Sequence, residues 1–194
     1  MLTEERRRKK MSEEFIVRNC FATLAGLKTG SLFRCTYHSS EELYDEIRRL
    51  NRRLADKGLR VLPLLVCNGE AQIYMYRTSH LRQDLAREEV LEILHRCGYD
   101  IGAMAEHQVV CLARRFRCSK DFPHEIGLFL GYPPEDVRGF MEQGSRACKC
   151  VGCWKVYGDV EAAQKRFDTF RSCKDCYLRC VTRGNTIEQL AVAG

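Results

Sequence analysis

The chain has 194 residues, of which 45% are hydrophobic, and this is enough for one domain with a substantial core. No stretch approaches the roughly 18 consecutive apolar residues of a membrane-spanning helix, and the charged start does not resemble a signal peptide. We therefore expect a cytoplasmic protein with no membrane partner. The net charge is +6, but acidic residues are interspersed among the basic ones, which argues against a nucleic acid as the partner.

Composition divides the chain into two segments. We predict that residues 1–12, which contain the dense charge run from Arg6 to Lys10, form a solvated N-terminal tail. Residues 13–194 contain no internal repeat and no low-complexity linker. They are therefore predicted to form a single α/β domain whose C-terminal third, at 148–180, is rich in cysteine.

The first part of this domain is predicted to alternate between helix and strand. We expect a helix over 13–23, a turn over 25–30 and a strand over 31–37, where apolar and polar residues alternate. After the serines at 39–40, which suit a helix N-cap, apolar residues recur at helical spacing until Gly58. These apolar positions are Leu43, Ile47, Leu50 and Leu54.

Two strands joined by a tight turn are predicted next. The apolar run 59–67 has the length of a strand buried on both faces, and Asn68-Gly69 is a strong hairpin signal before 71–77. The predicted fold class is therefore α/β, of the α+β type, with a small mixed sheet built from a β-α-β-β unit. We expect one core that contains Leu43, Ile47, Leu50, Val61, Leu62, Leu64, Leu65, Val66, Ile73 and Met75.

The second half is predicted to be mainly helical, with prolines at several of the joins. One later strand is expected at 151–157, and a short apolar tail follows the last helix. Several helices are thus expected to cover the sheet. They span 85–97, 101–117, 123–130, 134–142 and about 160–181.

Three segments resemble the signatures of one family. They are 23–33 (TLAGLKTGSLF), 124–133 (HEIGLFLGYP) and 150–157 (CVGCWKVY). In this order they resemble an uncharacterised domain-of-unknown-function family of anaerobic, largely clostridial bacteria, over a span from about Cys20 to 190–192. The resemblance implies a cytoplasmic protein of an anaerobe, and it supplies no catalytic or binding residues.

The chain contains twelve cysteines, a high number for a cytoplasmic protein. One group lies at 148–153, and a second at 173–180 has the spacing of one helical face. Four thiolates from the two groups could bind zinc or an iron-sulfur cluster. Buried small hydrophobes and redox-active thiols remain the alternatives. The candidate metal ligands are Cys148, Cys150, Cys153, Cys173 and Cys176.

Two other segments contain groups that could bind an anion or move a proton. Lys28 and Thr29 lie between glycines, in a turn that lacks the spacing of a P-loop. His124 and Glu125 begin a predicted helix, although adjacent helical residues point about 100° apart. A structural turn and a carboxylate that satisfies the helix dipole are the simpler alternatives. We hypothesise that Lys28 and His124 lie on one concave surface.

These patterns support three hypotheses about function. The first is a small metal-binding or redox-associated protein that uses the cysteines. The second is an enzyme that binds an anionic small molecule or cofactor near Lys28 and His124. The third is an RNA-binding or adaptor protein, for which binding should depend steeply on salt. The sequence specifies neither a reaction nor an oligomeric state.

Overall fold

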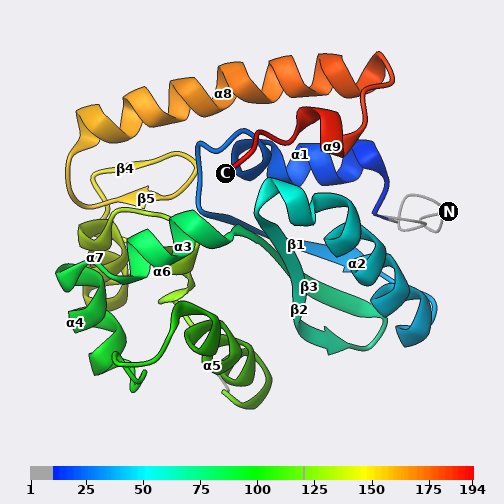
Figure 1. Ribbon diagram of the computed structural model, residues 1–194. Helices are drawn as coiled ribbons and strands as arrows, with labels where there is room; N and C mark the ends of the chain where they lie inside the picture. Colours follow the sequence, from blue (N-terminus) through cyan, green and yellow to red (C-terminus); the bar gives the residue numbers. More distant parts are fainter. Residues whose placement is uncertain (1–10, 120) are drawn as a thin grey trace, which may run out of the picture.

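The computed structural model describes residues 11–119 and 121–194 (Figure 1). A three-stranded antiparallel sheet with the order β1-β3-β2 lies at its centre. The α+β class is confirmed, and the sheet, predicted to be mixed, is antiparallel because β3 lies between the other two strands. The strands are β1 (Gly30–Thr36), β2 (Leu59–Cys67) and β3 (Glu70–Arg77).

The hairpin between β2 and β3 forms as the sequence predicts. Asn68 and Gly69 have φ values of 50° and 78°, which a two-residue hairpin turn of this kind requires. Cys67 therefore pairs with Glu70, and the two strands run antiparallel from this turn. The register shifts just after Pro63, a residue that cannot donate to the ladder.

One face of the sheet is covered by α1 (Glu13–Leu24) and α2 (Ser40–Leu54), which continues into the short helix η1 (Ala55–Lys57). The long helix α8 (Val160–Thr182) packs on the outside of α1, with α9 (Ile187–Leu190) beside it (Figure 1). The apolar stripe of α2 is buried in this layer, as its spacing predicts. Residues of the predicted core on this face are Leu43, Ile47, Leu50, Val61, Ile73 and Met75, with Val66 partly buried against them.

The opposite face is covered by a second group of helices. Leu64 is buried on this side, and Leu62 and Leu65 pack partly buried against the same cluster. The single core predicted from the sequence is therefore two cores, because successive side chains of a strand point to opposite faces. The helices on this side are α3 (Thr78–Leu85), α4 (Glu88–Arg96), α5 (Ala105–Cys118), α6 (Ile126–Phe129) and α7 (Pro134–Gln143).

The strand predicted at 151–157 is a small hairpin of β4 (Cys150–Val151) and β5 (Lys155–Val156). Buried Asp136 of α7 anchors it, because its carboxylate accepts hydrogen bonds from Trp154 Nε1 at 2.7 Å and from the backbone N–H of Tyr157 at 2.7 Å. The hairpin also packs on the first half of α8. A Cβ at Gly152 would lie only 2.2 Å from the Phe167 ring, so this contact requires glycine.

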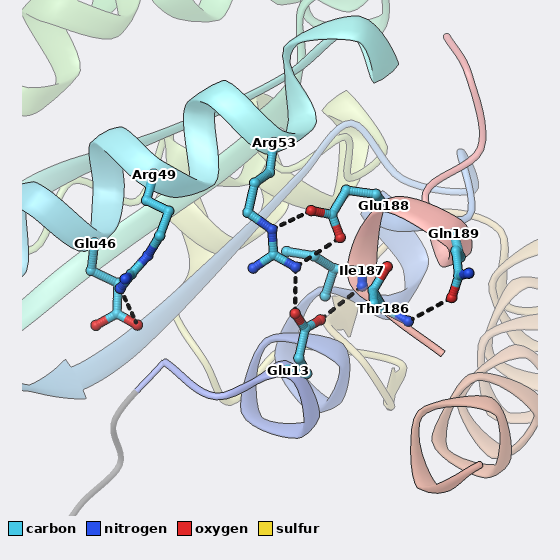
Figure 2. Close-up of polar contacts among 8 residues, drawn as sticks. All are labelled: Glu13, Glu46, Arg49, Arg53, Thr186, Ile187, Glu188 and Gln189. Carbon is cyan, nitrogen blue, oxygen red and sulfur yellow. Dashed lines mark hydrogen bonds and ion pairs between the residues drawn. The ribbon is translucent and has the colours of Figure 1, made fainter. Parts of the chain in front are cut away.

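The C-terminal helix α9, which the sequence analysis leaves as an apolar tail, is held by a polar network (Figure 2). Arg53 of α2 contacts Glu13 of α1 at 2.5 Å and Glu188 of α9 at 2.7 Å. The other oxygen of Glu13 accepts the N–H of Ile187 at 2.7 Å. This network joins the start of α1, the end of α2 and α9.

Most of the predicted tail, residues 1–10, lies outside the described residues. Met11 is buried in the first core, and Ser12 is the N-cap of α1, accepting the N–H of Phe15. None of the helices within 11–119 and 121–194 has both the length and the apolar run that crossing a bilayer requires.

Candidate functional site

A polar cavity of about 430 Å³ lies where the turn after α1 meets α3, the start of α7 and α8. Lys28 and Thr29, both predicted to contact an anion, line it. Its basic side chains outnumber its acidic ones. The basic residues are Lys28, His80, Arg87 and Arg166, and the acidic residues are Asp84 and Glu135.

Arg77 holds the turn that places Lys28. Its side chain is fully buried and donates to the carbonyls of Thr23 and Leu24, each at 2.6 Å, at the C-terminal end of α1. These carbonyls carry the negative end of the helix dipole, so they stabilise the guanidinium. The backbone N–H of Arg77 also donates to Thr29 O at 2.9 Å, so that one residue fixes both ends of the turn.

Thr29 connects the turn to two other parts of the cavity. Its hydroxyl donates to the Asp84 carboxylate of α3. Gly131 lies directly against it, since a Cβ there would come within 2.5 Å of Thr29 Oγ1. Gly131 also has a φ of 77°, so glycine is favoured at this position on both grounds.

Lys28 is a half-buried cation with an aromatic neighbour. Its Nζ lies 3.4 Å from the Tyr132 hydroxyl and 4.7 Å from the centre of that ring. Within the described residues, no carboxylate lies within ion-pair distance of it. Burial lowers the pKa of Lys28 to about 8. The thiols of Cys153 and Cys20 act in the opposite direction, and the Arg166 guanidinium lowers this pKa further. Buried Cys20 is not a counter-ion, because burial raises the pKa of its thiol to about 12.

Arg166 reaches the same cavity from α8. It donates to the carbonyl of Gly131 at 3.2 Å, and its guanidinium lies 5.1 Å from the centre of the Trp154 ring. Trp154 in turn stacks on Tyr132, with ring centres 5.1 Å apart. Among the residues that the structure describes, Arg166 also has no carboxylate partner. Two cations therefore lie beside one cavity with aromatic rings as their neighbours.

His124 lines a second hollow of about 280 Å³, which is mainly apolar. Its ring is exposed and packs edge-on against Phe140, with centres 4.8 Å apart. Tyr132 lines both hollows. We hypothesised that Lys28 and His124 lie on one concave surface. The structure instead places them in two adjacent hollows, which share Tyr132.

The side chain of Glu125 is paired with other side chains of the protein and has a structural role. Its carboxylate is buried and forms an ion pair with Arg115 Nε at 2.5 Å, and it accepts the Tyr99 hydroxyl at 3.1 Å. A buried carboxylate needs such partners. Through them the segment before α6 is linked to α5 by Arg115 and to the loop after α4 by Tyr99. The adjacent side chains of His124 and Glu125 thus face different surroundings, and Glu125 is not in the lining of either hollow.

The cysteines of 148–180 do not converge. Within 11–119 and 121–194, no group of three or more His, Cys, Asp or Glu side chains could hold a metal ion. The hairpin packs on α8 near Phe167, whereas Cys176 lies nine residues further along, about 13 Å at 1.5 Å per residue. The structure therefore gives no support to the predicted site of Cys148, Cys150, Cys153, Cys173 and Cys176.

The segments 23–33, 124–133 and 150–157 meet at Tyr132. Lys28 of the first segment contacts the hydroxyl of Tyr132, which belongs to the second segment. The same hydroxyl lies 3.5 Å from the carbonyl of Cys153 in the third segment. The model of a family described as "Protein of unknown function (DUF3793)" matches residues 16–191. The chain belongs to this family. DUF3793 membership confirms the resemblance to an uncharacterised domain-of-unknown-function family and brings no activity with it. Comparison with curated proteins and with solved structures gave no match.

Sequence reasoning does not single out two residues that line this cavity, Tyr132 and Arg166, or Arg77, which holds the turn beside it. Tyr132 lies within a recognised motif, where it was one apolar residue among many. Arg166 has the spacing of an ordinary exposed helix position, and Arg77 ends a strand. An arginine that ends an otherwise buried strand was the one available signal, because such a charge must find partners.

Proposed function

We propose that this chain binds a small molecule that carries a phosphate or carboxylate group, in the polar cavity beside Lys28. The observation that carries the proposal is the pair of cations, Lys28 and Arg166, which face the cavity without a carboxylate partner in the described part of the chain. Removing a cation from water is costly unless an opposite charge compensates for it. A bound anion would supply that charge.

The rest of the cavity is consistent with this ligand class. His80 and Arg87 add basic groups, while the carboxylate of Asp84 already accepts a hydrogen bond from Thr29. The cavity volume of about 430 Å³ suits a small metabolite. The polar lining favours recognition by charge and hydrogen bonds. Metal binding by the cysteines stays a prediction of the sequence, with no observation in the structure that favours it.

The test is a calorimetric titration of the protein with inorganic phosphate at pH 7. Lys28→Met should raise the dissociation constant about tenfold or more, because a charge-assisted hydrogen bond contributes about 1.5–3 kcal/mol. Lys174→Met is the matched control, since it removes one charge from an exposed position on α8. Its affinity should stay within about twofold of the wild type, as expected for a screened distant charge.

Two results would contradict the proposal. One is equal loss of affinity in Lys28→Met and Lys174→Met, which would indicate a general effect of net charge. The other is the absence of phosphate binding to the wild-type protein at millimolar concentrations. Circular dichroism of each variant shows that the comparison is made between folded proteins.

A further inference from the structure

We infer that Lys28 is also a nucleophile, whose ε-amine condenses with the aldehyde or ketone carbonyl of an anionic ligand bound in the cavity. This role rests on the proposed function, because the phosphate or carboxylate of the ligand must bring its carbonyl to Lys28. The resulting ligand class is a small oxo compound that carries an acidic group.

The surroundings of Lys28 differ from those of an ordinary surface lysine. Lys165, on the exposed side of α8, forms an ion pair with Glu161 at 2.7 Å, and such a partner favours the charged ammonium form. The amine of Lys28 lies beside a neutral phenol instead, at 3.4 Å from the Tyr132 hydroxyl. Arg166 acts on it as a like charge. Burial beside a second cation is the arrangement that activates lysine as a nucleophile.

The protonation state agrees with this geometry. Burial lowers the pKa of Lys28 to about 8. At pH 7.5 roughly a quarter of Lys28 side chains are then neutral, against about 0.1% for an unperturbed lysine. Only the neutral amine has the free electron pair that attacks a carbonyl carbon.

Anion binding and nucleophilic attack need not compete for the same group. Arg166 keeps its charge at every relevant pH and lines the same cavity as Lys28. A guanidinium can hold a phosphate or carboxylate through two parallel hydrogen bonds. Arg166 would therefore anchor the acidic end of the ligand, and Lys28 would face its carbonyl end.

The condensation consumes no oxidant or reductant. The electron pair of the neutral amine forms a C–N bond to the carbonyl carbon, while the carbonyl π electrons move to oxygen. That oxygen gains a proton and the nitrogen loses one, and departure of water then gives the imine. Burial raises the pKa of Tyr132 to about 12, so its hydroxyl stays protonated. It lies 3.4 Å from Lys28 Nζ, where it would supply the proton.

The experiment traps the imine in the intact protein. Wild-type protein is incubated with glyceraldehyde 3-phosphate and cyanoborohydride at pH 7.5, and peptide mass spectrometry measures the rate of labelling at each lysine. Lys28 should be labelled about tenfold faster than exposed Lys174, because more of its amine is neutral. The preference should be smaller with glyceraldehyde, which lacks the phosphate, and should fall when inorganic phosphate is added in excess.

Two variants separate the nucleophile from the cation. Lys28→Arg keeps the positive charge, so it should still bind phosphate but give no adduct at position 28. Tyr132→Phe keeps the ring and removes the hydroxyl, so it should slow labelling of Lys28 several-fold. Labelling of Lys28 no faster than Lys174, in a protein that binds phosphate, would overturn the inference and leave the proposed function standing. Absence of phosphate binding would overturn both.

Discussion

Arg53 and Lys28 are both half-buried cations, but their neighbours differ. Arg53 lies between two carboxylates, Glu13 and Glu188 (Figure 2), and this arrangement lowers the pKa of Glu188 to about 2. Lys28 lies beside Tyr132 and Arg166 and faces a cavity, without such a partner among the described residues. The first arrangement is complete and joins helices. The second has no carboxylate partner among the described residues, and this is the basis of the anion binding that we propose.

Arg77 is a third case that clarifies the comparison. Its guanidinium is buried more deeply than either, and backbone carbonyls of Thr23, Leu24 and Val192 accept its hydrogen bonds. A buried cation in this chain can therefore be satisfied by carboxylates or by carbonyls. Lys28, only a few residues from the end of α1, instead donates to the Tyr132 hydroxyl and has no carboxylate partner among the described residues.

The largest expected effect is that of Arg77→Met. The change leaves several buried carbonyls without donors, so we expect the free energy of unfolding to fall by about 3 kcal/mol or more. Chemical denaturation measures this loss. Exposed Arg60, on the neighbouring strand β2, is the control, and Arg60→Met should change stability by less than about 0.5 kcal/mol. A small change in the free energy of unfolding in Arg77→Met would show that the turn is stable without the hydrogen bonds of Arg77.

A smaller effect separates Arg53 from Arg166. Arg53→Met removes two partly exposed ion pairs and should lower the free energy of unfolding by about 1 kcal/mol, without a change in phosphate affinity. Arg166→Met should reduce phosphate affinity about tenfold. It should lower the free energy of unfolding less than Arg53→Met does. Denaturation and phosphate titration of both proteins give the four values. If the two variants lost stability and phosphate affinity to the same extent, Arg53 and Arg166 would not have the different roles that we assign to them.

A pH dependence is also expected at Lys28. Its folded-state pKa of about 8 lies below the ordinary value of 10.5, so the charged form destabilises the native state. This penalty is present below pH 8 and is relieved between pH 8 and 10.5. Relative to Lys28→Met, the wild type should therefore gain stability over this window while losing phosphate affinity. Parallel stability curves for the two proteins would contradict the lowered pKa.

Local patterns in the sequence predict much of the fold. The apolar stripe of α2 and the Asn68-Gly69 turn depend on neighbours in the chain, and both are confirmed. The division into two cores and the order of the strands depend on pairing between distant segments. The helix predicted at 85–97 is confirmed as α4, whereas the short helices α3 and α9 are not predicted, because they have too few residues for a periodic signal.

The candidate site is less predictable than the fold. Lys28 and Thr29 are detectable because glycines flank a cation and a hydroxyl in one short segment. Tyr132 and Arg166 acquire their role only when α6, α7 and α8 come together around that segment. The cysteines show the opposite outcome, because regular spacing in sequence does not bring the thiols of a hairpin and a long helix to one point.

Trp154 is the only tryptophan in the chain, and it is held between Tyr132, Arg166 and the Asp136 carboxylate. All tryptophan emission from this protein therefore arises beside the cavity. We expect its intensity and wavelength to respond to the nearby guanidinium and to the tilt of the stacked phenol. The molecule thus contains an intrinsic fluorescent reporter of this site, which needs neither a label nor a knowledge of the natural ligand.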